Sequence, residues 1–483
     1  MRGIPEITLA VYLDRHSAET LPTQLADQLR TLATQAVLAP GDALPSTRAL
    51  ASHLGVSRGT VVAAYDQLLA EGYLSASAGR STVVNPQLRR VHPPRPRPRV
   101  PRAPEPAPAY DLRPGRPWAE EVVGPAWKAA WRHASAAEVA LPTPVLGLPQ
   151  LRQAWSEHLR RMRAVVRNPA QVAVTGGGRE GFALVLLALA GDRPLRVGVE
   201  DPGYPSLRRV PVRVGASVLP LPVDEHGLKV ADLPTGRSAP DVLLVTPSHQ
   251  YPLGGSLPVD RRQALLEWAR TNKVVIVEDD YDSELRYTSE PLPALAALDD
   301  PDDGTVVLLG TLSKTLTPAL AMGFLGLPAR LVPAIADVRR DLGQPVGLVA
   351  QQAIATYLDA GALRLHTQRM RNRYRRRRVQ VVDALGDIPG ARMYPMDGGL
   401  HAVVETRRPE AAIVEALAHA GVRVSPLSEY WSGRGTRSGI VFGFGAANEA
   451  DLAAALSLIA AEVKGHAGAN HEPPPPPPRP PGR

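Results

Sequence analysis

The 483-residue chain contains no cysteine. This absence excludes disulfide bonds, metal sites built from thiolates, and cysteine nucleophiles. The twelve histidines are scattered along the chain rather than set at metal-ligand spacing, so we expect no metal site. The sequence also lacks an uninterrupted apolar run of about 18 residues, and it does not begin with the charged and then apolar pattern of a secretory signal. We therefore expect a cytoplasmic protein with no membrane partner.

Positive charge is unevenly distributed. The net charge is +8 and the pI is near 9.8, which permits a nucleic-acid partner. Residues 1–85, however, have a net charge of −1, whereas residues 86–108 have a net charge of +5 and contain nine prolines. This proline density is incompatible with helix interiors and indicates a polyproline II spacer with a reach on the order of 70 Å. We expect a Pro/Arg-rich linker at 86–109 and a disordered Pro-rich tail at 466–483.

Residues 1–85 form the first predicted domain. Apolar residues keep helical spacing from Leu25 to Ala36, a second short helix is predicted from Ser46, and a third follows Ser57, a favourable N-cap. The tight turn between the second and third helices indicates a helix-turn-helix. The sequence YLSASAGRSTVV then alternates small and apolar residues around a turn, as a two-stranded wing would.

Over residues 21–85 the string PSTRALASHLGVSRGTVVAAYDQLLAEGYL resembles the GntR-type winged helix. The resemblance implies a DNA-binding domain with operator DNA as its partner. At the start of the third helix, free backbone N–H groups and short polar side chains can meet phosphates and base edges. Taken alone, these residues would fit a capped surface helix equally well. The residues implied to contact DNA are Arg48, Ser57, Arg58 and Thr60, with Gly79 and Arg80 in the wing.

Residues 110–465 repeat one pattern, in which a short apolar run ends at a Gly, Pro or acidic cluster and a helical pattern follows. This alternation predicts an α/β domain. The runs are mostly continuous, which is typical of parallel strands covered on both faces, and ligands of such sheets bind beyond the carboxyl ends of the strands. We therefore expect the site in the five loops at the ends of the runs QVAVTGGG, LRVGVEDPGY, VLLVTPSHQYPLGG, VVIVEDDY and VVLLGTLSK.

Two of these loops carry residues suited to coenzyme chemistry. Period-two alternation puts Asp279 and Tyr281 on one face of their strand and Asp280 on the other. Lys314 directly follows another apolar strand. Alone, the acidic turn would fit a solvated loop and the lysine an ordinary surface cation.

Together, Asp279, Tyr281 and Lys314 resemble the cofactor residues of fold-type I pyridoxal-phosphate enzymes, over essentially all of residues 110–465. The resemblance implies a mostly parallel sheet, a small C-terminal subdomain, and pyridoxal 5′-phosphate (PLP) as cofactor. Lys314 would form a Schiff base with the aldehyde, Asp279 would pair with the pyridine nitrogen, and Tyr281 would contact the ring's 3-oxygen. The phosphate of the cofactor is expected to bind at a helix N-terminus, which the glycine-rich turn at Gly177 and Gly178 begins. The further residues expected near the cofactor are Gly177, Gly178, Arg179, Thr311 and Ser313.

The strings EDPGYPSLRR, TPSHQYPLGGSLPVDRRQALLEWA, EDDYDSELRY and GGLHAVV resemble the MocR subfamily of GntR regulators, which joins these two domains in this order. By this resemblance Tyr204 lies near the cofactor and Arg208 holds an effector carboxylate, although Arg208 also fits a surface cation. A second carboxylate-binding arginine is expected near the C-terminal strand. Arg437 is the candidate and Arg434 its rival.

The sequence departs from the aminotransferase pattern at the phosphate. That pattern has an arginine seven residues after the lysine, where this chain has Ala321. In the glycine-rich turn, Arg179 replaces the usual glutamine. We hypothesise that Arg179 supplies the missing charge, since a guanidinium binds phosphate in bidentate fashion. The alternative is weaker retention of the cofactor.

Residues 362–382 contain eight arginines, including the run Arg375 to Arg378. This run fits either a solvated basic helix face or a second DNA surface.

The combined expectation is a ligand-responsive transcriptional regulator that forms a head-to-tail homodimer. Its effector would be an amino acid or amine sensed through Schiff-base chemistry. One alternative is an active aminotransferase with an appended DNA-binding domain. Another is a regulator whose large domain has lost the cofactor and serves only for dimerisation.

Overall fold

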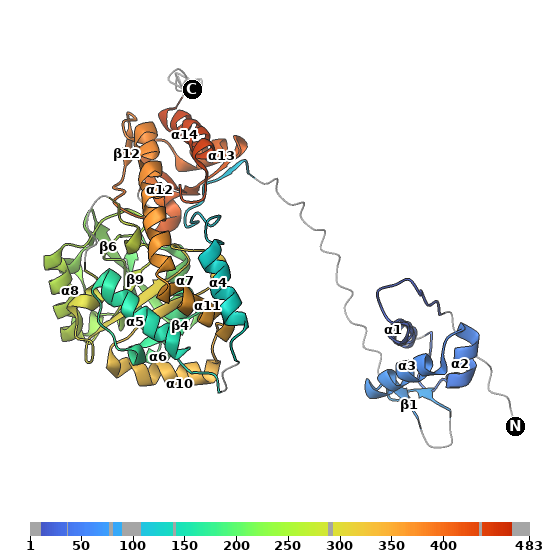
Figure 1. The fold of residues 1–483 in the computed structure, drawn as a ribbon. Helices are drawn as coiled ribbons and strands as arrows, with labels where there is room; N and C mark the ends of the chain where they lie inside the picture. The colour runs from blue at the N-terminus through green and yellow to red at the C-terminus, as the bar shows by residue number, and fades with distance from the viewer. Residues whose placement is uncertain are drawn as a thin grey trace, which may run out of the picture. The chain divides into compact units, whose positions relative to one another are not determined.

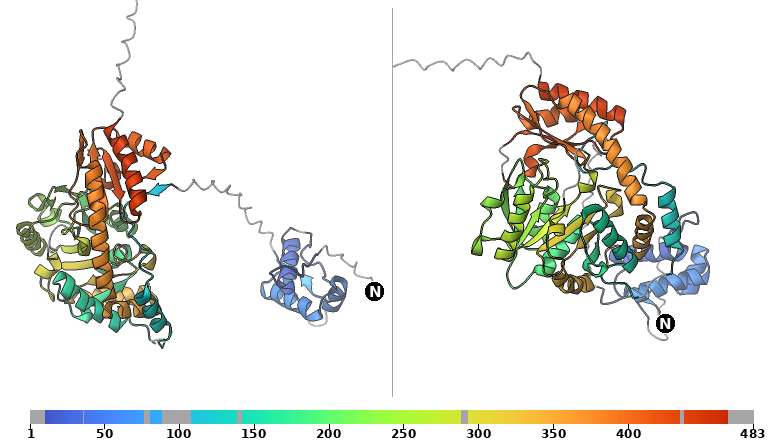
Figure 2. Two further views of the ribbon diagram at one scale, coloured as in Figure 1. Left: turned by 45° about the horizontal axis from the view of Figure 1, so that its top comes forward. Right: turned by 60° about the vertical axis from the view of Figure 1, so that its left-hand side comes forward.

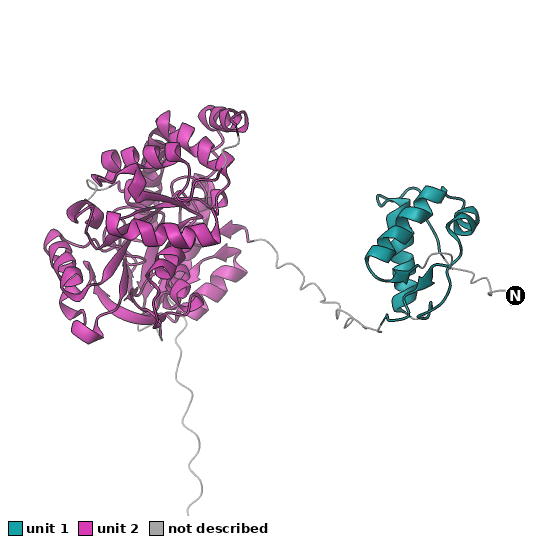
Figure 3. Cartoon of the chain, turned by 90° about the horizontal axis from the view of Figure 1, so that it is seen from below, with its two compact units in different colours: residues 1–105 teal, residues 106–483 magenta. Residues whose placement is uncertain are grey.

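The computed structural model describes residues 11–35, 37–76, 81–88, 108–138, 142–287, 293–433 and 437–465. Gly79, Arg80, Ala36 and Arg434, most of the predicted linker and the predicted tail at 466–483 lie outside these ranges. The chain divides into two compact units, residues 1–105 and 106–483 (Figure 3). Each unit is described by itself.

The first unit is a three-helix domain with a small β-ribbon. Its helices are α1 (Leu21–Thr34), α2 (Thr47–Leu54) and α3 (Arg58–Ala70), and its antiparallel strands are β1 (Leu74–Ser75) and β2 (Val83–Val84). The helices are capped by Thr20, Ser46 and Ser57, whose side chains each accept a hydrogen bond from a backbone N–H of the first turn. The turn between α2 and α3 has Gly55 at φ 62°, a left-handed conformation that glycine adopts at little cost. The three helices share one buried core with the ribbon.

The second unit is built on an eight-stranded sheet of order β4-β11-β10-β9-β8-β5-β6-β7 (Figure 1). From β10 to β6 neighbouring strands run parallel, while β11 and the edge strand β7 are antiparallel to their neighbours. Most residues of β4, β8, β9, β10 and β11 are buried, as their continuous apolar sequences predict. The strands are β4 (Val172–Thr175), β5 (Arg196–Asp201), β6 (Ser217–Asp224), β7 (Gly227–Leu228), β8 (Val242–Val245), β9 (Val275–Asp280), β10 (Val306–Thr311) and β11 (Gly323–Gly326).

Helices cover both faces of this sheet, and each face has its own apolar core. One core includes α5 (Pro149–Arg163), α8 (Val259–Asn272), α9 (Leu295–Leu298) and α11 (Leu348–Asp359), with α4 (Pro125–Ser135) packed on α11. The other includes α6 (Gly178–Leu189), α7 (Pro205–Arg213) and α10 (Val332–Leu342). This three-layer arrangement confirms the predicted α/β class with a mostly parallel sheet.

A smaller C-terminal lobe completes the second unit, as predicted. Its antiparallel sheet has the order β12-β13-β16-β15, and the long helix α12 connects the large sheet domain to the lobe (Figure 2). Strand β14 pairs in parallel with β3, so the first strand that the structure describes in the second unit is attached to this lobe. The elements are β3 (Tyr110–Asp111), α12 (Ala362–Leu385), β12 (Ala391–Met393), β13 (His401–Thr406), α13 (Glu410–His419), β14 (Val422–Arg423), β15 (Ser425–Pro426), β16 (Gly439–Gly443) and α14 (Glu449–Lys464).

Within the described ranges, no helix combines the length and the apolar character needed to cross a membrane.

Candidate functional site

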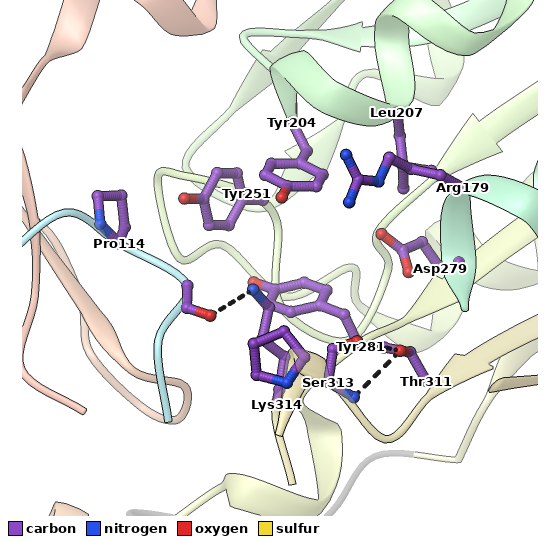
Figure 4. Close-up of a pocket in the computed structure, with 13 residues that line it drawn as sticks. Pro114, Arg179, Tyr204, Leu207, Tyr251, Asp279, Tyr281, Thr311, Ser313 and Lys314 are labelled. Atoms are coloured by element: carbon purple, nitrogen blue, oxygen red, sulfur yellow. Dashed lines mark hydrogen bonds between the residues drawn. The ribbon is translucent and has the colours of Figure 1, made fainter. Parts of the chain in front are cut away.

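A cavity of about 200 Å³ lies beyond the carboxyl ends of β5, β8, β9 and β10, where ligands of open parallel sheets bind (Figure 4). Eight of the residues predicted near a cofactor line it. The full lining comprises Pro114, Gly115, Gly178, Arg179, Tyr204, Leu207, Tyr251, Asp279, Tyr281, Thr311, Ser313, Lys314 and Pro318. Gly177 is not among the lining residues, but it is the N-cap of α6 and precedes Gly178 directly.

Asp279 and Asp280 lie side by side in β9 and face opposite sides of the sheet. Asp279 faces the cavity, and its carboxylate makes no hydrogen bond or ion pair with another described residue. Burial raises the pKa of Asp279 to about 8, and the nearby carboxylates of Asp280 and Asp282 add to the rise. Asp280 instead pairs with the buried guanidinium of Arg163, whose Nε lies 2.7 Å from the carboxylate. The alternation thus gives the cavity one buried carboxylate that a cationic ligand atom would stabilise.

Lys314 lies three residues beyond the end of β10, and its amine is in the cavity. The Nζ atom donates a hydrogen bond of 2.9 Å to the carbonyl oxygen of Gly115, in the segment between β3 and α4. It also lies 5.9 Å from the centre of the Tyr204 ring. Gly115 has φ +94°, and a Cβ atom at this position would lie 2.7 Å from Nζ. The left-handed backbone at this position favours glycine, and a Cβ there would displace the lysine amine from its present place.

Aromatic rings form the wall of the cavity opposite Lys314 and beside it. The Tyr204 and Tyr251 rings meet edge to face with centroids 5.2 Å apart, and Tyr251 and Tyr281 are 5.7 Å apart in a similar arrangement. The phenol oxygen of Tyr281 lies 3.0 Å from Nδ1 of His249 and 3.1 Å from its carbonyl oxygen. Burial raises the pKa of Tyr281 well above its ordinary value, so this phenol keeps its proton at neutral pH.

The N-terminus of α6 forms another side of the cavity. Gly177 caps it with φ 94°, and Arg179 extends its guanidinium into the cavity near Asp279 (Figure 4). Arg179 is exposed and forms no hydrogen bond or ion pair within the described part of the chain. Nearby, the Thr311 hydroxyl donates to the Ser313 hydroxyl at 2.9 Å. Free N–H groups, two hydroxyls and an unpaired guanidinium together suit an anionic group.

Ala321 occupies the place where the aminotransferase pattern has an arginine. It is exposed, adopts φ 47° at the end of a short 3-10 helix, and does not line the cavity.

Neither predicted carboxylate-binding arginine lines the cavity. Arg208 donates to the carbonyl oxygens of residues 429–431, with distances of 2.7 to 3.3 Å, and lies 3.7 Å from Asp201. Arg437 donates to the hydroxyl of Tyr394 and lies 3.8 Å from Glu405. Both guanidinium groups therefore hold parts of the fold together.

The arginine run in α12 is neither a uniformly solvated face nor a row of free cations. Arg377 is buried and donates to the carbonyl oxygens of Phe444 and Gly445. Arg375 donates to the Tyr287 carbonyl and Arg378 to the Met396 carbonyl. Arg376 is exposed and lies 3.7 Å from Glu449.

The predicted DNA-contacting residues gather at the start of α3 and on α2. Ser57 caps α3, and its hydroxyl lies 2.9 Å from that of Thr60. Arg48 and Arg58 are exposed, and Nε of Arg58 lies 3.4 Å from the Thr47 hydroxyl. These four side chains leave the N-terminus of α3 accessible, as a recognition helix requires.

The sequence did not single out two parts of the cavity lining, Tyr251 and the Pro114-Gly115 wall, nor His249, which contacts Tyr281. Tyr251 and His249 lie in the loop after β8, which was expected to contribute to the site, and only their roles went unrecognised. The signal for the wall was weaker, because its segment lies far from Lys314 in sequence and follows no strand of the large sheet.

Comparison with known proteins agrees with this architecture. Residues 21–84 match the bacterial regulatory proteins of the gntR family, and residues 117–438 match aminotransferase class I and II. The chain is 48% identical over 444 residues to the HTH-type pyridoxine biosynthesis transcriptional regulator PdxR of Corynebacterium glutamicum, covering 92% of this chain and 96% of the relative. The chain belongs to the MocR-type GntR transcriptional regulators.

Two further likenesses support this membership. The regulator is 32% identical over 464 residues to the probable rhizopine catabolism regulatory protein MocR of Rhizobium meliloti, covering 89% of this chain and 91% of the relative. Its large unit also resembles LysN, the α-aminoadipate aminotransferase of Thermus thermophilus, with a TM-score of 0.64 and 24% identity over 73% of this chain and 92% of that one. The second likeness shows the fold alone. The large unit of this MocR-type regulator thus has the fold of a class of PLP-dependent enzymes.

Proposed function

We propose that this regulator binds pyridoxal 5′-phosphate in the cavity at Lys314 and that the bound coenzyme changes how the chain binds operator DNA. The observation that carries the proposal is that Lys314, Asp279 and Tyr281 line one cavity, together with the segment that follows the linker. When bound, the coenzyme supplies an electrophilic aldehyde and a ring that acts as an electron sink.

The residues present fit this coenzyme. Asp279 offers a buried carboxylate with no hydrogen-bonding partner in the described chain, and a protonated ring nitrogen would stabilise its charge. Lys314 offers the amine that bonds to aldehydes. The N-terminus of α6 and the hydroxyls of Thr311 and Ser313 would hold the phosphate, and Arg179 would neutralise it in the absence of an arginine at Ala321. We propose Tyr204 as an edge of the same site.

We further propose that the coenzyme is itself the signal. A relative that is 48% identical over nearly its whole length is named as a transcriptional regulator of pyridoxine biosynthesis, and pyridoxine is a compound of the same chemical class as this coenzyme. Arg208 and Arg437 are engaged with other groups, so no guanidinium except Arg179 faces the cavity among the described residues. Sensing of an amino acid or amine is the alternative, and it would require one of these arginines to change partners.

We propose that Gly115 is the first residue through which ligand binding in the cavity affects DNA binding. Its carbonyl accepts the Lys314 hydrogen bond, and the strand β3, four residues earlier, directly follows the predicted linker. Any ligand that engages the Lys314 amine competes with this hydrogen bond, so ligand binding changes what holds residues 112–116 in place. A ligand shifts DNA affinity only through its unequal affinity for two arrangements, and this contact would differ between them. We propose that two chains act as a head-to-tail homodimer that presents two winged helices to a pair of half-sites.

The test is a DNA-binding selection on the full chain with and without pyridoxal 5′-phosphate, followed by affinity measurements on the selected sequences. The expected result is one enriched motif whose affinity changes at least several-fold with the coenzyme in the wild-type chain and not in Lys314→Ala. Equal affinity with and without coenzyme would contradict the regulatory proposal. A coenzyme response only after an amine is added would favour the alternative effector, whereas steady transamination over many turnovers would favour an enzyme.

A further inference from the structure

Two buried polar residues beside Tyr281, His249 and Asp282, do not line the cavity. Nδ1 of His249 lies 2.9 Å from the carboxylate of Asp282 and 3.0 Å from the phenol oxygen of Tyr281. His249 and Asp282 are each only 3% exposed at their side chains. The His249 and Tyr281 rings lie nearly parallel, 19° apart, with centroids separated by 6.0 Å.

We assign the hydrogen of the His249 ring to Nδ1. Its near partner is the carboxylate of Asp282, and an ionised carboxylate only accepts hydrogen bonds. The same Nδ1–H points toward the phenol oxygen of Tyr281, and the phenol donates to the carbonyl oxygen of His249. The phenol oxygen therefore receives a donor from His249. Its own hydrogen is donated to the His249 carbonyl oxygen, and a ligand oxygen in the cavity would compete with that carbonyl for it.

We infer that His249, held by Asp282, is a positioning residue that makes the Tyr281 phenol a stronger hydrogen-bond donor toward a ligand oxygen in the cavity. The inference rests on the proposed binding of pyridoxal 5′-phosphate. A hydroxyl that accepts a hydrogen bond becomes a better donor, because chains of hydrogen bonds polarise one another. Tyr281 would thereby hold negative charge on the coenzyme's ring oxygen and favour the deprotonated form of the group bonded to Lys314.

Other titratable groups surround this pair. Asp279 and Lys314 line the same cavity as Tyr281, and the Tyr251 ring meets the Tyr281 ring edge to face. His401, in β13, packs 5.5 Å from the His249 ring, but its Nε2 contacts the carbonyl oxygen of Pro252 and not the phenol. Burial, with a smaller contribution from nearby His249, lowers the pKa of His401 to about 4, so it remains neutral through the neutral range. His401 therefore provides a matched control within the same cluster.

The experiment follows the pH dependence of the visible absorbance of coenzyme bound to the full chain, with binding stoichiometry measured alongside. His249→Leu removes the donor to Tyr281 and should raise the apparent pKa of the absorbance change by about one unit, a tenfold change in proton affinity. Asp282→Asn, which replaces the anionic acceptor of the Nδ1–H group by a neutral amide oxygen, should shift the apparent pKa in the same direction by a smaller amount. His249→Asn places an amide nitrogen near the Nδ1 position and should restore most of the wild-type value, which a purely structural role would not predict. His401→Gln should leave the apparent pKa unchanged.

Two kinds of failure are distinguishable. If wild-type chain shows no absorbance that depends on Lys314, the proposed coenzyme binding is wrong. If His249→Leu and Asp282→Asn both bind coenzyme with an unshifted apparent pKa, or His401→Gln shifts it as far, the positioning role is wrong while coenzyme binding stands. If His249→Leu fails to fold, Asp282→Asn and His249→Asn still decide the question, because one should shift the value and the other should not.

Discussion

The carboxylates of Asp279 and Asp280, adjacent in β9, differ in their partners: Asp280 binds the buried guanidinium of Arg163, and Asp279 faces an open cavity without an ion pair. Replacing each carboxyl group by an amide should therefore change the stability of the protein in opposite directions. Ionised Asp280 stabilises the fold, whereas ionisation of Asp279 is unfavourable until a cationic ligand atom arrives.

We expect Asp279→Asn to stabilise the coenzyme-free protein and to weaken coenzyme binding. The folded pKa of Asp279 is raised to about 8 by burial, so its contribution to stability is present at low pH and is lost as pH rises toward 8. The advantage of the variant in free energy of unfolding should grow between about pH 4 and pH 8, to on the order of a few kcal/mol. Thermal denaturation across this pH range measures it.

Asp280→Asn is the matched comparison. It leaves the buried Arg163 without its carboxylate, which costs about 3 to 5 kcal/mol where a buried pair loses one partner. Equal destabilisation by both variants would show that Asp279 is ionised and stabilising in the free protein.

Arg179→Ala should weaken binding of pyridoxal 5′-phosphate by about 10- to 100-fold, the loss expected for a charge-assisted hydrogen bond. Binding of pyridoxal, which has no phosphate, should change much less. Arg209→Ala removes an exposed arginine of α7 that does not line the cavity and should leave both affinities unchanged. Titrations followed by the absorbance of each compound give the dissociation constants. If Arg179→Ala bound pyridoxal 5′-phosphate as tightly as the wild-type chain does, Arg179 would not contact the phosphate.

Arg58→Ala should weaken operator binding and reduce the slope of log affinity against log salt by about 1, because an exposed guanidinium at the start of α3 can neutralise one phosphate. Gln67→Ala changes an exposed residue near the other end of the same helix and serves as the control. Fluorescence anisotropy at several salt concentrations separates the two variants. If the slope of log affinity against log salt were unaltered in Arg58→Ala, Arg58 would not contact the DNA backbone.

Arg377→Gln should lower the free energy of unfolding by roughly 1 to 3 kcal/mol, because the buried guanidinium donates to two carbonyl groups that would lose their partner. Arg376→Gln alters an exposed neighbour and should be nearly neutral. Chemical denaturation measures the stability of both variants. If Arg377→Gln instead changed the salt dependence of DNA affinity without loss of stability, the arginine run would be a second DNA surface.

Much of the fold followed from local patterns. Ser57 as an N-cap, the glycine turn at Gly55 and the continuous apolar strands are local signals, and they predicted the winged helix and the parallel sheet, both of which are confirmed. Alternation in β9 likewise separated Asp279 from Asp280. These features were predictable because they depend on residues close together in sequence.

The remaining features depend on contacts between distant segments. Arg208 was expected to hold a ligand carboxylate, yet its three acceptors come from carbonyl groups more than 200 residues away. The acceptors of Arg377 are likewise backbone oxygens of another element. Backbone carbonyls are present at every residue and leave no mark on the sequence, so pattern alone could not distinguish a structural arginine from a free one.

The attachment of β3 to β14 has a mechanical consequence for the whole chain. Asp111 is fastened to the C-terminal lobe, and Gly115, four residues later, is fastened to Lys314. Four residue steps span at most about 14 Å when fully extended, so the segment 111–115 can lengthen only a little. A displacement of the lobe by a few ångströms would therefore move the partner of Lys314. A pulling force from the DNA-binding end of the chain would act first on the two residue pairs between β3 and β14, and only then on the cavity.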